Sequence, residues 1–398
     1  MLSLDKVFSA QAVLKNIIRE TNVVRAYGIA PDCELYLKPE NLQITGSFKV
    51  RGSAYKIACL SDAEKKNGVI ACSAGNHAQG VALAATKNGI KSLICLPDTA
   101  PISKVEATKG YGAEVCLVEG CYDDAYQKAL SLCEETGATL IHPFDDEEVI
   151  AGQGTIGLEI LEQIGDADAV VVPVGGGGLV AGVAYAIKHL RPDIKVYGVQ
   201  AERAASMAQS LKLGKQITLD SVSTFADGIA VKHPGDNTFK LIGEYVDDVV
   251  TVTEDEIATA ILTLMEKQKL VAEGAGAVSV AAVMFDKVPV KGKKVVCVVS
   301  GGNIDVNILS RVVTRGLVTT GRNATLQIAL EDKPGQLLGV SSIISRCGGN
   351  VVSVHHERSD ANMAVASCFL KIGMETRDFE QIEEIRQELT KAGFKIVS

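Results

Sequence analysis

The segment AVVVPVGGGGLVAGVAYAI, residues 169–187, indicates the fold of most of the chain. It begins with a valine-rich run, passes through four consecutive glycines and continues as an apolar stretch of helical length. The segment is long and uncharged enough to cross a membrane, but Pro173 and the glycines would cost a spanning helix its backbone hydrogen bonds. We therefore expect a buried strand, a glycine turn and a buried helix.

Similar apolar runs recur along the first 320 residues, with helical patterns between them. They are GVIAC (68–72), SLICL (92–96), EVCLV (114–118), VYGVQ (196–200) and KVVCVVS (294–300). Strands that are apolar throughout are buried on both faces, which is typical of parallel sheets covered by helices. The predicted fold class is α/β, with two open, mainly parallel sheet domains.

One acidic stretch indicates how residues 1–320, the expected catalytic domain, divide into two subdomains. A break at 143–154, which contains the run DDEE, predicts the return from a smaller inserted subdomain to a larger one. We expect the smaller subdomain at about 53–150 and the larger at 1–52 and 151–320.

The sequence changes character at Gly321, where a small domain of residues 321–398 begins. Gly348 and Gly349 are expected to end its first helix. The predicted elements are a strand (324–330), a helix with Leu337, Val340, Ile344 and Cys347 on one face, strands at 351–356 and 363–372, a helix with Ile382, Ile385 and Leu389, and a strand at 394–397. This βαββαβ order is that of a ferredoxin-like unit.

Composition excludes several classes of function. The chain has 398 residues and a formal net charge of −8, without a run of Lys or Arg, which disfavours nucleic acid and anionic membrane surfaces as partners. Its ten cysteines show no CxxC spacing, and the first residues lack a signal-peptide pattern, so we expect a cytoplasmic protein. The six histidines show no metal-ligand spacing. We expect no metal site, and we interpret the pair His355 and His356 as structural.

The four glycines at 175–178 are typical of an anion site. Between a strand and a helix, glycines let consecutive N–H groups converge on one anion, and the helix N-terminus adds partial positive charge. The pattern is not GxGxxG followed by an acidic residue, so a monophosphate is favoured over a dinucleotide. The alternative is a tight strand-to-helix turn, which needs only one or two glycines.

Three other short segments carry reactive side chains. In SFKVRG (47–52), Lys49 stands between apolar neighbours that would lower its pKa and make it a nucleophile, although most lysines are surface residues. SAGNHAQG (73–80) opens a helix where a carboxylate would bind, although Asn76 could merely cap that helix. In SGGN (300–303), Ser300 ends a strand at the ligand-binding edge of the sheet, or forms an ordinary turn.

In this order, the four segments resemble those of pyridoxal-phosphate enzymes of the tryptophan-synthase-β type, the second fold type of that cofactor class. AGQGTIGLEI (151–160), FADGIAV (225–231) and TVTEDEI (251–257) narrow the resemblance to the threonine dehydratases, or threonine ammonia-lyases. The resemblance implies pyridoxal 5'-phosphate as cofactor, with a Schiff base at Lys49. It implies further cofactor contacts from Phe48, Asn76 and Ser300, and phosphate binding by Gly175, Gly176, Gly177, Gly178 and Leu179. It also implies that the substrate is bound by Ser73, Ala74, Gly75, Asn76 and His77.

The resemblance also implies a reaction. L-Threonine would lose its β-hydroxyl and yield 2-oxobutanoate and ammonia, and L-serine would yield pyruvate. His77 is expected to support the loop rather than act as acid or base. Two residues depart from the related serine racemases: Ala74 replaces the serine that moves a proton on the face opposite the lysine, and Ala208 replaces a carboxylate of their cation site, of which Glu202 remains.

The C-terminal unit, with DKPGQL at its first turn, resembles an ACT domain, an amino-acid-sensing module. The resemblance implies a homo-oligomer, a dimer or tetramer, whose activity responds to an amino acid such as isoleucine. A purely structural domain is the alternative. Three other interpretations of the whole chain stay open: a serine dehydratase or racemase, a β-replacement enzyme of the same fold, and a catalytically idle amino-acid sensor.

Overall fold

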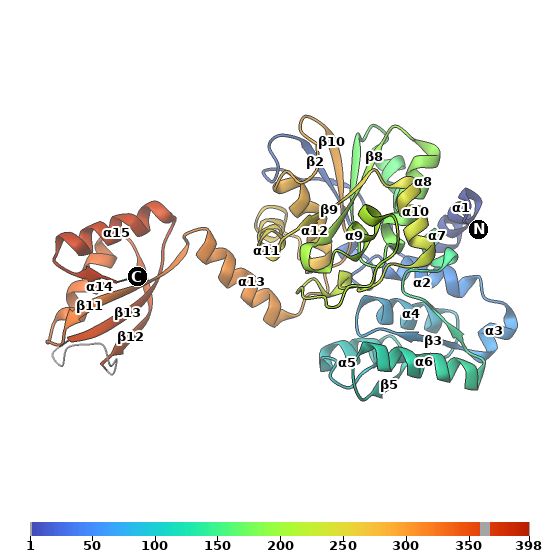
Figure 1. Cartoon of the computed structure of the whole chain (residues 1–398), viewed down its shortest axis with the longest axis horizontal. Coiled ribbons are helices and arrows are strands. Elements are labelled where there is room, and N and C mark those ends of the chain that lie inside the picture. Colours follow the sequence, from blue (N-terminus) through green and yellow to red (C-terminus); the bar gives the residue numbers. More distant parts are fainter. Residues whose placement is uncertain (1, 359–366, 398) are drawn as a thin grey trace. The chain divides into compact units, whose positions relative to one another are not determined.

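The chain forms two compact units. The computed structural model describes residues 2–358 and 367–397. The units are Met1–Asp305 and Val306–Ser398, so helix α13 (Val306–Thr319) groups with the second unit, whereas the sequence predicts a boundary at 320/321. In Figure 1 the first unit shows a larger and a smaller lobe, each built on its own sheet.

The larger lobe holds a six-stranded sheet in the order β1-β2-β10-β7-β8-β9, in which only the β1–β2 pair is antiparallel. All five residues of β7 are buried, as expected for a central strand covered on both faces. The strands are β1 (Val24–Arg25), β2 (Glu34–Pro39), β7 (Ala169–Pro173), β8 (Lys195–Ala201), β9 (Asp248–Val252) and β10 (Lys294–Val299).

Helices cover both faces of this sheet. Among the described residues, no helix is both long and apolar enough to cross a membrane, and residues 169–187 form β7, the glycine turn and most of α8. The helices of this lobe are α1 (Leu4–Leu14), α2 (Lys49–Ala58), α7 (Glu147–Gln163), α8 (Gly178–Leu190), α9 (Ser206–Leu213), α10 (Asp236–Tyr245), α11 (Glu254–Thr263) and α12 (Gly274–Met284), with short turns η1 (Glu40–Leu42), η2 (Glu202–Ala204), η3 (Asp227–Ile229) and the π-helical η4 (Leu264–Gln268).

The smaller lobe holds a four-stranded parallel sheet in the order β5-β4-β3-β6. Its elements are α3 (Asp62–Asn67), β3 (Val69–Cys72), α4 (Asn76–Lys87), β4 (Ser92–Pro97), α5 (Ile102–Gly110), β5 (Glu114–Val118), α6 (Tyr122–Thr136) and β6 (Thr139–Leu140). Helix α2 packs against both α4 and α7, so the start of α2 lies where the two lobes meet.

In the predicted segment 143–154 the chain passes from β6 of the smaller lobe to α7 of the larger lobe. Helix α7 already begins at Glu147, because the Asp146 side chain accepts hydrogen bonds from the N–H groups of Glu148 and Val149. Carboxylates are stabilised at a helix N-terminus by these donors and by the helix dipole. Within this return to the larger lobe, the acidic run caps the start of α7.

The second unit follows the predicted βαββαβ order after α13. Its four-stranded sheet has the order β12-β13-β11-β14, and all described pairs are antiparallel. Its elements are β11 (Asn323–Glu331), α14 (Gln336–Arg346), β12 (Asn350–Glu357), β13 (Ser367–Glu375), α15 (Phe379–Lys391) and β14 (Lys395–Ile396). The predicted start of the third strand, at 363–366, lies outside the described residues. On α14, Val340 and Ile344 are buried as predicted, but Leu337 in the first turn is 42% exposed.

Glycines allow α7 to pack unusually close to its neighbours. A methyl group on Gly182 of α8 would overlap the carbonyl oxygen of Ile150, and one on Gly152 of α7 would lie 2.7 Å from the carbonyl oxygen of Arg51. The AGQG motif therefore has a packing role, since it lets α2, α7 and α8 approach backbone to backbone.

We expect Gly182→Ala to lower the free energy of unfolding by about 1–3 kcal/mol, because the added carbon has no space in the α7–α8 contact. Chemical denaturation measures the change. Gly110→Ala is the matched control, since nothing lies within 4 Å of a methyl group added there, and it should be neutral or slightly stabilising. Equal effects of the two substitutions would contradict the close-packing account.

Candidate active site

Lys49 is the first residue of α2 and is half-buried. Its Nζ donates a hydrogen bond to the carbonyl oxygen of Pro143 at 2.8 Å and lies 5.3 Å from the centre of the Phe48 ring. Burial lowers the pKa of Lys49 to about 8, although the Glu273 carboxyl opposes this shift. A substantial fraction of the amine is therefore unprotonated, and nucleophilic, at mildly alkaline pH.

The loop before Lys49 is bound to the loop after β10. The N–H of Phe48 donates to the carbonyl oxygen of Ser300 at 3.0 Å, and the N–H of Gly302 donates to that of Gly46 at 2.9 Å. Ser47 and Gly301 form an isolated antiparallel bridge. Because β2 and β10 are parallel neighbours, SFKVRG and SGGN leave the sheet at the same edge and meet there.

A buried cluster of charges anchors α2. The Arg51 guanidinium pairs with Glu40 at 2.8 Å and with Glu159 at 2.6 Å, and Lys38 pairs with Glu159 at 2.5 Å. Arg51, Lys38 and Glu40 are fully buried. Since an unpaired buried charge costs several kcal/mol, this cluster ties α2 to the end of β2 and to α7.

Asn76 takes part in a hydrogen-bond network rather than capping its own helix. Its Nδ2 donates to Glu273 Oε1 at 2.7 Å, and its Oδ1 accepts from Asn303 Nδ2 at 2.8 Å. Asn303 also donates to the carbonyl oxygen of Thr45 at 2.8 Å. The N-cap of α4 is Gly75, which makes no side-chain hydrogen bond. The network therefore joins SAGNHAQG, SGGN and the loop before Lys49.

Glu273, which sequence reasoning missed, lies at the centre of this network. It precedes α12 and is only 5% exposed. Burial raises its pKa to about 7, with a contribution from the Asp227 charge and opposition from the Asn76 hydrogen bond. The available signal was one acidic residue before the helix GAGAVSVAAVM, in which Ser279 is the one polar residue, and in sequence this acidic residue looks like an ordinary cap.

The other residues of SAGNHAQG have local structural contacts. Ser73 Oγ accepts from the N–H of Gly75 at 3.2 Å, and Ser73, Ala74 and Gly75 are half-buried. His77 is buried, and its Nε2 lies 2.8 Å from the carbonyl oxygen of Ile141. Burial, and then the Lys49 charge, lower the pKa of His77 to about 3. A histidine that stays neutral in this way supports the loop and is a poor acid.

The glycine loop, residues 175–178, has the shape of an anion cradle. Gly177 adopts a φ of +99°, and side-chain carbons at Gly176 or Gly178 would overlap Phe144. Gly178 and Leu179 are the first residues of α8, so their N–H groups have no acceptor within the helix. A phosphate would satisfy these donors and meet the positive end of the helix dipole.

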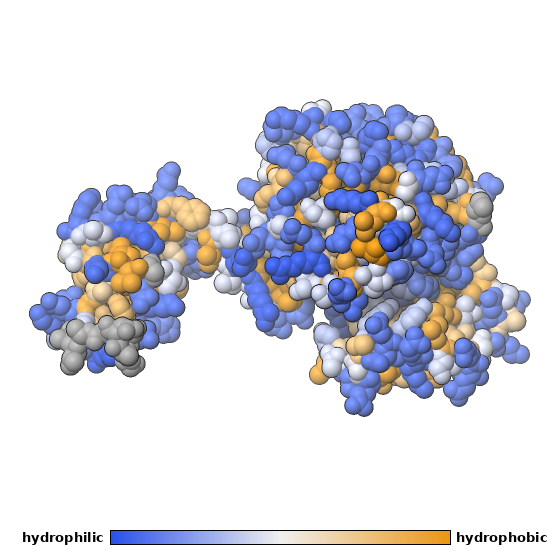
Figure 2. Space-filling model, in the orientation of Figure 1, coloured by the Kyte–Doolittle hydropathy of each residue, from blue (hydrophilic) through white to orange (hydrophobic). Residues whose placement is uncertain are grey.

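Two residues connect the glycine loop to Lys49. Pro143 accepts the Lys49 hydrogen bond, and its neighbour Phe144 packs against Gly176 and Gly178. Ser300 is 2% exposed and donates to the carbonyl oxygen of Ala275 at 3.3 Å. The four motifs therefore gather around one part of the first unit, and Figure 2 shows this unit hollowed between its two lobes.

This donor set fits pyridoxal 5'-phosphate. The group needs an amine with a lowered pKa for its aldehyde and a cradle of N–H groups for its phosphate, and Lys49 and the glycine loop supply these parts. Lys49 and Gly175 are 126 positions apart in the sequence, so only the folded chain brings the amine and the cradle together.

Comparisons with known proteins agree with this geometry. Residues 14–301 match the family described as pyridoxal-phosphate dependent enzyme. The chain is 50% identical to an L-threonine ammonia-lyase of Thermotoga maritima, over all of this chain and 99% of that protein. The processed form of threonine deaminase isoform 2 from Solanum lycopersicum has a TM-score of 0.75 and 39% identity, over 78% of this chain and 87% of that one. A maize serine racemase has a TM-score of 0.75 and 36% identity, over 80% and 98%.

The chain therefore belongs to the pyridoxal-phosphate dependent enzymes of the second fold type. Within that class it belongs with the L-threonine ammonia-lyases, because its similarity to one of them extends over its full length. The family and the cofactor predicted from the sequence, pyridoxal 5'-phosphate, are thus confirmed.

The raised pKa of Glu273 predicts a pH-dependent stability. A carboxyl whose pKa is higher in the folded state stabilises the fold below its unfolded value, and this contribution is lost as the pH rises from about 4.5 to about 7. Relative to Glu273→Gln, the cofactor-free wild type should therefore lose up to about 3 kcal/mol between pH 4.5 and pH 8. Denaturant unfolding at a series of pH values measures this difference.

Glu134→Gln, at an exposed position of α6, is the control and should track the wild type at every pH. A stability difference between wild type and Glu273→Gln that stays flat with pH would contradict a buried titrating carboxyl at 273.

Proposed function

We propose that the chain converts L-threonine to 2-oxobutanoate and ammonia by β-elimination, and L-serine to pyruvate and ammonia. The observation that carries this proposal is the full-length similarity to an L-threonine ammonia-lyase together with a low-pKa lysine at the meeting point of four motifs. A serine would bind in the same way, and the extra methyl group of threonine can discriminate by only about 1–3 kcal/mol.

In this proposal the cofactor is held at both ends. Lys49 would bind its aldehyde, the N–H groups of residues 175–179 its phosphate, Asn76 its ring hydroxyl and Ser300 its ring nitrogen, while Phe48 packs beside it. Bound there, the cofactor supplies an electron-withdrawing ring that stabilises negative charge at the substrate Cα. The neutral hydroxyl of Ser300 makes this ring a weaker electron sink than a carboxylate would, which suits prompt loss of a β-leaving group.

Lys49 would also move the proton of the substrate Cα. An amine with a pKa of about 8 is suited to accept a proton near neutral pH. The start of α4, with Ser73 and the N–H groups of 75–77, would bind the substrate carboxylate and orient its Cα–H toward Lys49. Neutral His77 leaves this proton transfer to the lysine.

Racemisation is the second candidate, because a serine racemase has a similar structure. It requires a group that exchanges a proton on the face opposite the lysine. Position 74 is alanine, whose methyl group cannot carry a proton. We therefore propose elimination as the main reaction and expect little D-amino acid among the products.

We expect Lys49→Ala to lower kcat/KM for L-threonine by at least about 10²-fold, because the variant loses both the cofactor attachment and the base. The assay measures 2-oxo acid and ammonia in the absence of any thiol, so product formation by the wild type also argues against a β-replacement enzyme. Lys66→Ala, an exposed lysine of α3, is the control and should keep full activity.

Borohydride reduction followed by peptide mapping should place the pyridoxyl label on Lys49. A label on another lysine would overturn the role proposed for Lys49. An unlabelled and inactive wild type would overturn the proposed function and favour an idle sensor.

We further propose that the second unit is an ACT-like regulatory domain in a cytoplasmic homo-oligomer. Strand β12 lies at the edge of its sheet, with Val352 56% and Val354 41% exposed, so it can pair with another copy. All ten cysteines are free, which a reducing cytoplasm favours.

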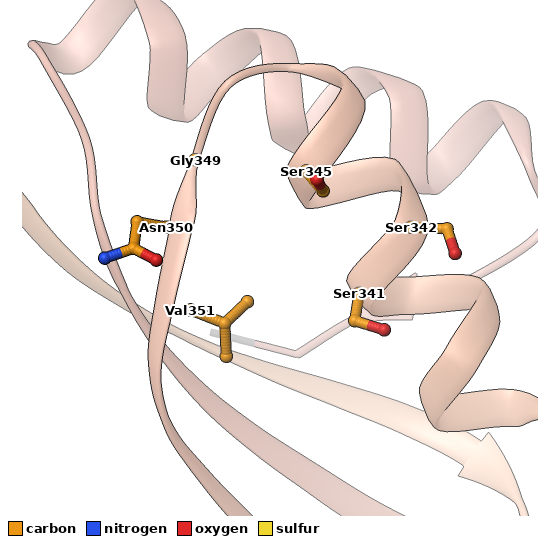
Figure 3. A pocket seen from close by; sticks show the side chains of 6 residues that line it. All are labelled: Ser341, Ser342, Ser345, Gly349, Asn350 and Val351. Carbon is orange, nitrogen blue, oxygen red and sulfur yellow. The ribbon is translucent and has the colours of Figure 1, made fainter.

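A groove of about 530 Å³ lies between α14 and β12 (Figure 3), lined by Ser341, Ser342, Ser345, Gly349, Asn350 and Val351.

Isoleucine is the expected effector, and the groove or the turn at 332–336 is its expected site. Titration calorimetry on the full chain should detect binding, and the KM for L-threonine should rise with isoleucine concentration. Ser345→Leu, which fills the groove, should weaken both effects without changing basal activity. Binding with no change in kinetics would reject allosteric control and leave a structural domain.

A further inference from the structure

Three potential metal ligands meet in the second unit, whereas every motif of the candidate active site belongs to the first. Asp332 directly follows β11, His356 lies on β12 and Cys368 lies on β13. One ligand atom of each residue lies within 4.8 Å of the others, and His356 Nε2 is 2.9 Å from Cys368 Sγ.

Strand register explains this meeting. Strand β13 lies between β12 and β11 and pairs His356 with Leu370 and Leu330 with Cys368. Paired residues and residues two apart share one face of a sheet. Because Leu370 and Cys368 are two apart, His356 and Cys368 point to the same face. Asp332, two residues after Leu330, continues that face.

One ligand of the cluster is buried, whereas the other two are exposed to solvent. Cys368 is 1% exposed and adjoins the core of the unit, whereas Asp332 and His356 are exposed, so a cation could enter from solvent and reach the sulfur. Arg358 pairs with Asp332 Oδ1 at 3.1 Å. An exposed pair of this kind is worth at most about 1 kcal/mol, so a cation could displace the arginine at little cost.

The donor atoms are those of a zinc-type site. An imidazole nitrogen, a thiol sulfur and a carboxylate oxygen suit Zn²⁺ or Co²⁺, whereas Mg²⁺ and Ca²⁺ require oxygen ligands. Three protein ligands leave the fourth tetrahedral position open for water or a small ligand.

We propose that Asp332, His356 and Cys368 bind one divalent cation of the zinc type in the C-terminal unit. This site does not depend on the proposed catalytic function. It also changes the sequence-based interpretation of the histidine pair, because His356 becomes a ligand while His355, on the opposite face of β12, does not.

The test uses the full-length holoenzyme, reduced and freed of metal by a chelator. Co²⁺ should produce visible d–d bands of tetrahedral intensity, at wavelengths longer than the absorption of the cofactor, and they should saturate at an equimolar ratio to the chain. Zn²⁺ should abolish these bands by competition, and excess Mg²⁺ should not.

Variants assign the ligands. His356→Ala and Cys368→Ser should weaken Co²⁺ binding by at least about tenfold, because each removes one of only three protein ligands. His355→Ala and Cys347→Ser are the matched controls, a neighbouring histidine and a half-buried cysteine of the same unit, and they should bind as the wild type does. Circular dichroism checks that each variant is folded.

Two results would overturn the proposal. One is a wild type that shows no tetrahedral cobalt spectrum. The other is a spectrum that persists in folded His356→Ala or Cys368→Ser, since the cation would then be held elsewhere, by other cysteines or by the cofactor site.

Discussion

The buried charges around Arg51 are the constraint on which the rest of the first unit depends. Arg51 must lie between Glu40 and Glu159, because Arg51 and Glu40 are fully buried, Glu159 is nearly so, and each charge therefore needs its partner. That requirement holds together the end of β2, the first turn of α2 and the middle of α7. Lys49 precedes Arg51 by two residues, so the position of the reactive amine follows from an ion cluster that takes no part in the chemistry.

Close packing and desolvation then set the shape of the site and the pKa values of its groups. Glycines in α4 and α7 let these helices approach the first turn of α2 without side chains between them; an added carbon on Gly80, for example, would lie 3.1 Å from the N–H nitrogen of Val50. The same exclusion of water lowers the pKa of Lys49 and raises that of Glu273.

The second unit has its own core and its own order of elements. Its sheet is antiparallel, and its buried residues, among them Leu326, Ile328 and Ile372, pack under α14 and α15. One edge strand, β12, borders the serine-lined groove and carries His356. Pairing with another copy, effector binding and the proposed cation site would therefore all act on one strand, which gives a physical route by which they could influence one another.

Much of this protein could be predicted from the sequence alone. Apolar runs such as 169–174 predict buried parallel strands, because a strand covered on both faces has no polar positions. The motifs around Lys49, Asn76 and Ser300 indicate a cofactor. The reactive amine and the turns that such a cofactor needs are each supplied by a few consecutive residues, so the sequence shows them directly. The βαββαβ order of the last unit is likewise a matter of local periodicity.

Only the tertiary structure decided which distant groups meet. Glu273 looks like a helix cap in sequence, and it becomes the partner of Asn76 only because α12 starts beside α4. His356 looks like one half of a structural pair, and strand register alone sets it beside Cys368 and Asp332. Periodicity reports which face of its own element a residue occupies, whereas contacts between elements depend on topology and register, which the local pattern of residues does not contain.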